Sequence, residues 1–274
     1  MEVAIQLVSV LQSGNSNIEN LLRSIKDQGY DGVEVARRFG GLFGHSPVEF
    51  RKMLDDNGLK CTGCTTALDD LNVENIHQLA EDYNILGGNN LYCADLIVKQ
   101  DEIMNESAWL GAAERFNEYA LILKNYHLKI GVHNHNTEFS MLSSGRTGWD
   151  IFFDNTCDLV LQELDTYHCI EGGGNPAYYI NKYQNRTPIV HIKEFPRNQD
   201  IDTGGLLPDP IAAGKYMIPF GEGTSDWMSI FEACKNAKVE WYVAECYMGI
   251  GDNNDIIVSR QMIDFIRHNL NKMA

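Results

Sequence analysis

The segment LVLQELDTYHCIEGGGNPAYYINKYQNRTPIVHIK (residues 159–193) contains the alternation that decides the fold. It begins with a mainly apolar run at 159–164, passes a helix start at Asn175-Pro176, and ends in a second apolar run at 188–193. Short apolar runs suit strands that are buried on both faces of a parallel sheet. Asparagine followed by proline favours the first turn of a helix. The segment therefore predicts one strand–helix unit followed by the next strand.

Eight such apolar runs occur along the chain, separated by longer amphipathic segments. They lie at residues 3–8, 32–36, 60–65, 90–94, 129–133, 159–164, 188–193 and 241–245. Eight strand–helix units suit a single (β/α)8 TIM barrel, which typically needs about 250 residues. We therefore predict an α/β protein with one TIM barrel domain over residues 1–274.

Helical patterns fill the intervals between these runs. Residues 18–28 carry apolar side chains at helical spacing, which marks one buried helix face. Ser46, Pro47 and Glu49 form the signature of a capped helix start. Gly58 stands where that helix should end, because glycine favours the left-handed conformation of a helix C-terminus.

The chain is strongly acidic, with 38 Asp and Glu residues against 22 Lys and Arg and a formal net charge of −16. Such a surface repels phosphate backbones and anionic lipids, so we expect neither nucleic acid nor membrane among its partners. Seven scattered cysteines do not fit a disulfide framework. The sequence shows no basic, apolar leader and no 18-residue apolar stretch, so we expect a cytoplasmic protein.

Residues that bind metals or protons stand at the ends of five predicted strands. In chain order they are Glu34, His133, His135, Glu138, Asp165, His168, His191, Lys193 and Glu245. The carboxyl ends of barrel strands meet at one face, where TIM barrels carry their catalytic groups. A mixed set of imidazoles and carboxylates suits one divalent metal ion, namely Mn²⁺, Mg²⁺, Co²⁺ or Zn²⁺.

The residues around these strand ends resemble the xylose-isomerase-like sugar phosphate isomerase/epimerase family, which shares its barrel with endonuclease IV. The matching motifs are ELDTYH (163–168), GGGNP (172–176), HIKEF (191–195) and AE (244–245), together with GYDGVE (29–34) and FGEGTSDW (220–227). The segment GVHNHNTEF (131–139) is similar to a subgroup with the same His-Asn-His signature. The resemblance covers most of the chain, and it is most specific over residues 163–194.

In that family one divalent ion is held by a Glu after the fifth strand, an Asp after the sixth, a His after the seventh and a Glu after the eighth. The resemblance implies Asp165, His191 and Glu245 for the last three places. At the first place the family Glu aligns with His133, so either His133 is the ligand or Glu138 reaches in from the following loop. We place Glu138 in the ligand set.

The resemblance also implies a reaction. Isomerising or epimerising a sugar removes a proton next to a carbonyl, and a metal ion stabilises the enediolate that forms. We keep His133 and His135 as catalytic residues, with His168 and Lys193 expected to hydrogen-bond substrate oxygens as their family counterparts do. We therefore predict a metal-dependent sugar isomerase or epimerase that acts on a small-molecule sugar.

Three other functions compete with this one. The His-Asn-His departure suggests a metal-dependent lyase or hydratase that acts on a keto-sugar or keto-glycoside through the same enediolate. An abasic-site nuclease needs basic DNA contacts, which the charge of −16 disfavours. A sugar-binding barrel without catalysis would keep sugar affinity and show no metal-dependent turnover. A homo-oligomer fits the family, whose members often form dimers or tetramers.

Overall fold

The eight strands form a closed barrel in which each strand pairs in parallel with its sequence neighbours and β8 pairs with β1. The strands are β1 Glu2–Gln6, β2 Gly32–Ala36, β3 Lys60–Thr66, β4 Asn90–Cys93, β5 Lys129–His133, β6 Val160–Asp165, β7 Ile189–Ile192 and β8 Trp241–Ala244. The computed structural model describes residues 1–10, 17–36, 42–94, 96, 102–196, 217–248 and 254–273. The predicted TIM barrel is confirmed, and no strand end differs from its prediction by more than two residues.

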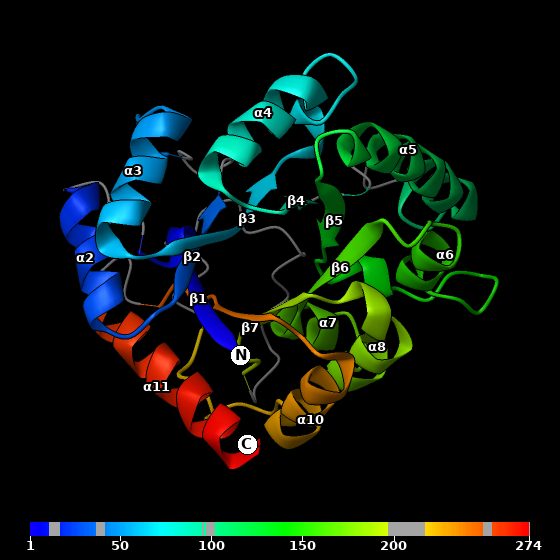
Figure 1. The fold of residues 1–274 in the computed structure, drawn as a ribbon. Coiled ribbons are helices and arrows are strands. Elements are labelled where there is room, and N and C mark those ends of the chain that lie inside the picture. The colour runs from blue at the N-terminus through cyan, green and yellow to red at the C-terminus, as the bar shows by residue number, and fades with distance from the viewer. Residues whose placement is uncertain are drawn as a thin grey trace.

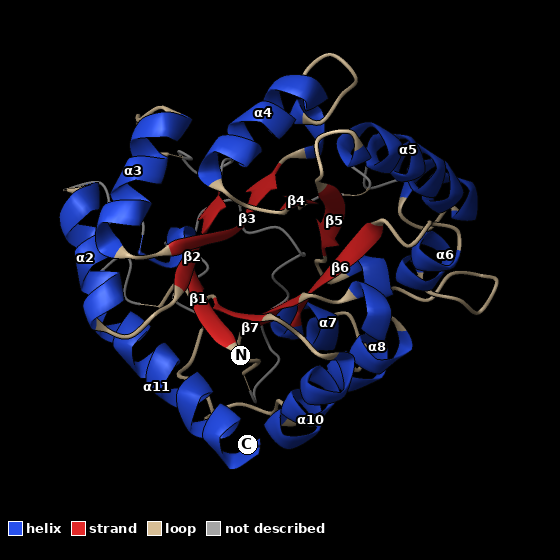
Figure 2. Ribbon diagram, viewed as in Figure 1, coloured by secondary structure: helices blue, strands red, loops and turns tan. Residues whose placement is uncertain are grey.

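The helices surround the strands as an outer ring (Figure 1, Figure 2). They are α2 Ile18–Asp27, α3 Pro47–Asn57, α4 Ile76–Leu86, α5 Glu106–Lys124, α6 Gly148–Asp154, α7 Thr166–Glu171, α8 Pro176–Lys182, α10 Trp227–Ala237 and α11 Asp255–Met273. Short 3-10 helices lie at η1 Leu7–Val10, η3 Leu68–Asp70, η5 Thr137–Phe139 and η6 Gln184–Arg186. In the described part of the chain, every helix is too short or too polar to cross a lipid bilayer.

The predicted capping signals act as expected in α3. The Ser46 hydroxyl accepts a hydrogen bond from the Glu49 backbone N–H, and the Glu49 carboxylate accepts one from the Ser46 backbone N–H. Gly58 ends the helix with φ of 62°, in the left-handed region. These local signals fix where the chain leaves the helix and enters β3.

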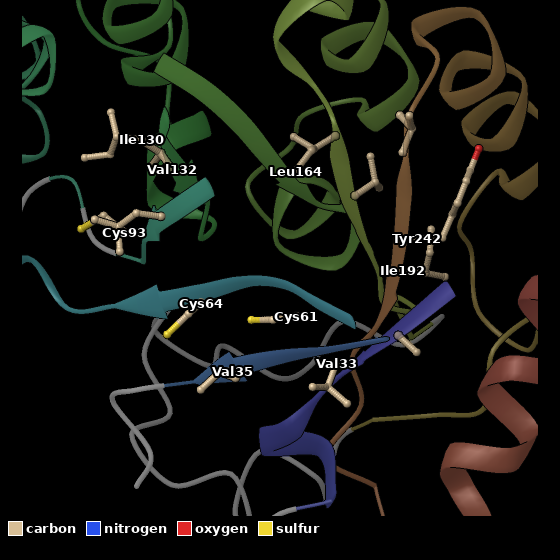
Figure 3. Packing of buried hydrophobic residues seen from close by; sticks show 14 of the residues in the cluster. Val33, Val35, Cys61, Cys64, Cys93, Ile130, Val132, Leu164, Ile192 and Tyr242 are labelled. Carbon is tan, nitrogen blue, oxygen red and sulfur yellow. The ribbon is translucent and has the colours of Figure 1, made fainter. Parts of the chain in front are cut away.

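The strands use their two faces differently. Val33 and Val35 of β2, Leu164 of β6, and Ile192 of β7 belong to the large hydrophobic cluster that also includes the buried faces of the helices (Figure 3). Because side chains alternate along a strand, the residues between them face the barrel interior. Glu34, Asp165 and His191 are therefore interior residues, although each has apolar neighbours in sequence.

The barrel interior is apolar toward the N-terminal ends of the strands and polar toward their C-terminal ends. Ala4, Tyr92, Leu161, Ile189 and Val243 form a small cluster of their own. Gly131 makes room for the Tyr92 ring, since a Cβ at Gly131 would lie 2.3 Å from the ring carbon Cδ1 of Tyr92. Two residues further along β6, β7 and β8, the interior positions are occupied by polar side chains. The candidate site therefore rests on a packed apolar floor.

Candidate active site

Four fully or almost fully buried residues from four consecutive strand ends converge at the C-terminal mouth of the barrel. They are His133, Asp165, His191 and Glu245, and we call them the outer group. One ligand atom from each lies within 4.8 Å of the others. Asp165 and His191 are paired across β6 and β7, while His133 ends β5 and Glu245 follows β8. Closure of the barrel therefore assembles a set of two imidazoles and two carboxylates.

His191 lies at the centre of this arrangement. Its Nδ1 is 2.5 Å from Glu245 Oε2, whereas its Nε2 is 3.1 Å from Glu34 Oε2. Glu34 is in turn held by Thr65, whose hydroxyl donates to Glu34 Oε1 at 2.8 Å, and by the Gln6 amide. A carboxylate on one ring nitrogen orients an imidazole whose other nitrogen binds a metal. Glu34 therefore directs His191 Nδ1 toward the outer group.

Asp165 is held in position through its backbone and through one oxygen of its side chain. The Asn134 side chain accepts a hydrogen bond from Asp165 N at 2.8 Å and donates one to Asp165 O at 3.2 Å. Asp165 Oδ1 caps α7 by accepting from His168 N at 2.8 Å. Among the described residues, Asp165 Oδ2 has no hydrogen-bond partner, although it lies 3.6 Å from His133 Nε2. A buried carboxylate oxygen that accepts no hydrogen bond is well suited to bind a metal ion.

The ionisable groups perturb one another strongly. Burial disfavours the charged form of His133, but the neighbouring carboxylates of Asp165 and Glu245, 3.6 and 3.8 Å from its Nε2, outweigh burial and raise its pKa to about 9. Burial also opposes ionisation of Glu245, yet Lys193 and the histidines hold the pKa of Glu245 well below its usual range. Lys193 likewise lowers the pKa of buried Asp165, so both carboxylates are ready ligands. Glu34 and Glu163 outweigh burial and raise the pKa of His191, so His133 and His191 must each lose a proton before they bind a metal.

Lys193 stands beside the outer group and is itself buried. Its Nζ lies 2.9 Å from Glu245 Oε1, 3.5 Å from Asp165 Oδ2 and 3.3 Å from His168 Nε2. Burial lowers the lysine pKa, but Glu245, Tyr247 and Asp165 together raise it well above its usual value. The ammonium group therefore stays charged and acts as a hydrogen-bond donor.

His168 and His135 complete the predicted catalytic set. His168 Nδ1 lies 3.2 Å from Glu171 Oε2, and its Nε2 lies 3.3 Å from Lys193 Nζ, so the tautomer with a proton on Nδ1 suits both contacts. The rings of His135 and His168 are 5.0 Å apart between centroids. Burial and the neighbouring His168 and His133 lower the pKa of His135 well below 6.5, so His135 is neutral. The structure places Lys193 and the His168 and His135 rings close to the outer group.

Glu138 is placed differently from its predicted role. It lies in η5, and its Oε2 accepts hydrogen bonds from His135 N at 3.0 Å and from the Thr137 hydroxyl at 3.2 Å. These bonds hold its carboxylate to its own loop, and His133 takes the fourth place among the outer group. Of the two alternatives for the ligand after the fifth strand, the geometry favours His133 over Glu138.

Several residues of the site were not singled out by sequence reasoning. Glu163 lies two residues before Asp165 on the same face of β6, and Gln6 and Thr65 reach the site through Glu34. Tyr247 donates a hydrogen bond to Glu245 Oε1, and its ring lies 4.7 Å from Lys193 Nζ. Because side chains two residues apart on a strand share a face, the position of Asp165 could have indicated that Glu163 also faces the barrel interior. The position of Tyr247 two residues past Glu245 is a weaker signal, because it lies outside the strand.

Glu194 anchors the chain next to Lys193. Its Oε1 accepts from Phe195 N at 3.0 Å and Ser225 N at 3.2 Å, and its Oε2 accepts from Gly221 N at 2.8 Å and Trp227 Nε1 at 2.6 Å. One buried carboxylate thereby joins the end of β7 to the start of α10. The backbone carbonyl of Lys193 is held as well, since it lies 2.8 Å from the Thr166 hydroxyl.

The sequence agrees with this architecture when it is compared with known proteins. Residues 22–267 match the family model described as the xylose isomerase-like TIM barrel. The chain belongs to that family. In this xylose isomerase-like barrel the outer group therefore occupies the mouth that the fold uses for its chemistry.

The relatives of this xylose isomerase-like barrel carry names that refer to different activities. Inosose dehydratases from two strains of Clostridium perfringens are 25% identical over 149 residues, which cover 52% of this chain and 48% of theirs. The chain thus matches about half the length of these curated relatives. A sugar phosphate isomerase/epimerase from Parabacteroides distasonis superposes with a TM-score of 0.77 at 19% identity, covering 97% of both chains. The IOLI protein, solved with a zinc atom, superposes with a TM-score of 0.73 at 16% identity, covering 99% of both chains.

Proposed function

We propose that this protein is a divalent-metal-dependent isomerase or epimerase of a small sugar. The observation that carries the proposal is the outer group, with Lys193 and His168 beside it at the barrel mouth. Two imidazoles and two carboxylates suit Mn²⁺, Co²⁺ and Zn²⁺, and Mg²⁺ less well because it prefers oxygen ligands. Asp165 Oδ2, which accepts no hydrogen bond among the described residues, fits the same conclusion, since a bound metal ion would satisfy it.

The ion would be held by His133, Asp165, His191 and Glu245. When bound, it supplies Lewis-acid stabilisation of the negative charge that develops on a substrate carbonyl as a neighbouring proton leaves. Lys193 adds a fixed positive charge and a hydrogen bond toward the same substrate oxygens. Because it stays protonated, Lys193 cannot be the base.

His168 is the residue that we assign to proton transfer. In the tautomer that suits its two contacts, Nε2 is an acceptor beside Lys193 and Nδ1 donates to Glu171. An imidazole oriented by a carboxylate in this way acts as a general base, which contributes typically about 10²–10⁴-fold to the rate. His135 lies beside His168 as a neutral ring, with 5.0 Å between the ring centroids.

A second candidate is a lyase or hydratase that acts on a keto-sugar or keto-glycoside. The similarity to inosose dehydratases favours it. It uses the same proton abstraction but continues by expelling a group from the adjacent carbon. Tyr247 then offers a proton donor, because burial and Glu245 raise its pKa and keep the phenol protonated.

The test is an NMR screen of ketoses, inositol ketones and 3-keto-glycosides with Mn²⁺ in D₂O. An isomerase or epimerase yields a product of the same formula with deuterium at the carbon next to the carbonyl, whereas a lyase loses water or an aglycone. We expect both turnover and deuterium incorporation to stop when the metal is removed by a chelator. Full activity after complete chelation would contradict the proposal.

A further inference from the structure

A second cluster of acidic and imidazole groups lies directly beneath the outer group. It comprises Glu34, Glu163 and His191, all fully buried, and we call it the inner group. His191 Nε2 is 3.1 Å from Glu34 Oε2 and 3.4 Å from Glu163 Oε1. Ligand atoms bound tetrahedrally to a metal at about 2.0–2.1 Å are separated by about 3.3–3.4 Å. Both measured separations from His191 Nε2 are close to that spacing, and the three ligand atoms all lie within 4.8 Å of one another.

The inner group also contains buried polar atoms that lack hydrogen bonds. Among the described residues, neither carboxylate oxygen of Glu163 has a hydrogen-bond partner, although the residue is completely buried. Buried polar atoms are nearly always paired, so the two oxygens of Glu163, which accept no hydrogen bond beside a buried imidazole, indicate a small polar occupant.

The charges of the site point to a cation as that occupant. Four buried carboxylates, Glu34, Glu163, Asp165 and Glu245, share the barrel interior with one buried lysine, Lys193. A divalent ion at the outer group still leaves one carboxylate charge without compensation. An isolated buried charge is costly, and it is relieved either by a second cation or by a proton.

We propose that Glu34, Glu163 and His191 form a second metal site, the inner site, which takes a divalent ion of the Mn²⁺ or Zn²⁺ type. His191 joins the two sites, because its Nδ1 faces the outer group and its Nε2 faces the inner group. The imidazole gives up its remaining proton when both nitrogens are ligands. The competing occupant is a proton shared between Glu34 and Glu163.

Counting metal ions in variants distinguishes these occupants. The protein is stripped with a chelator, refilled with Mn²⁺, desalted and analysed for bound metal, and the same titration is followed by calorimetry. We expect two equivalents in the wild type, one in Glu163→Gln, and two in the matched control Glu240→Gln, whose carboxylate is exposed. Glu163 is chosen because Glu34 also orients His191 for the outer group. Circular dichroism verifies folding, and Glu163→Met, of similar size without oxygen atoms, should repeat the count of one.

The outcomes separate this inference from the proposed function. One equivalent in the wild type that Glu245→Gln removes and Glu163→Gln retains would overturn the inner site, identify the shared proton, and leave the proposed function intact. Two equivalents in both the wild type and Glu163→Gln would also overturn it. One equivalent that Glu163→Gln removes and Glu245→Gln retains would support the inner site and count against the outer one.

Discussion

Strands β5 to β8 supply every residue of the outer group, whereas β1 to β3 supply Gln6, Glu34 and Thr65, which reach that group only through His191. The two halves of the barrel have the same strand–helix pattern and the same apolar outer face. They differ in the interior residues near the C-terminal mouth. The second half carries the candidate ligands of the outer group, and the first half carries groups that hold one of those ligands, His191, in place. Substitutions in the two halves should therefore differ in size and in kind.

The largest effect is expected in the second half, from Glu245→Gln. An amide is a poorer ligand than a carboxylate, so metal affinity and activity should be lost together. The loss should exceed the roughly 10–100-fold that removal of a supporting residue costs. Calorimetric titration with Mn²⁺ and an activity assay measure both. The exposed Glu240→Gln, at the opposite end of β8, should leave both unchanged.

Lys193→Ala should reduce kcat without removing the metal. Loss of one donor that stabilises developing charge costs about 10²–10³-fold in kcat. Bound metal and kcat are measured on the same preparation, with the exposed Lys238→Ala as the control. Loss of metal in parallel with activity would show that Lys193 maintains the ligand set instead of contacting substrate.

In the first half, Glu34→Gln should weaken metal binding at the outer group by about 10–100-fold without abolishing it. The amide keeps the size of the side chain but no longer accepts a charge-assisted bond from His191 Nε2, which is 3.1 Å away. The measurement is the same calorimetric titration. If Glu34→Gln lost as much metal affinity as Glu245→Gln, the two halves of the barrel would not differ in the way proposed.

The smallest expected effect is the change in metal affinity for each unit of pH. In the metal-free protein the pKa of His133 is about 9, so below that pH a proton competes with the metal for this ring. The pKa of His191 is raised as well, so apparent affinity should rise at least tenfold per pH unit from pH 7 to 9. His133→Gln should bind more weakly and lose one proton from this dependence. A flat profile in the wild type would exclude His133 as a ligand.

The strands and helices were predictable because their signals are local. Apolar runs of about five residues, the Ser46–Glu49 capping box and Gly58 each act within one turn or one strand. The residues Asp165, His191 and Glu245 were predictable as a group, since parallel strands of a barrel end at one mouth.

The choice between His133 and Glu138 was not predictable in the same way. It depends on hydrogen bonds within η5, where Glu138 turns back to His135 N. The inner group was missed because Glu34 and Glu163 lie on strands that are not adjacent, and only barrel closure brings both to His191. Contacts across a barrel depend on its diameter and stagger, which no single stretch of sequence specifies.

The Glu194 carboxylate makes two separate parts of the chain depend on one side chain. It ties residue 195 to residues 221, 225 and 227, so the chain leaves and re-enters the barrel at one fixed junction. Gly223 belongs to the junction too, because a Cβ there would lie 2.1 Å from Phe195 O. Because one carboxylate holds both sides, the position of the chain after Lys193 and that of the start of α10 are coupled. Loss of the Glu194 carboxylate would therefore release both sides of the junction at once.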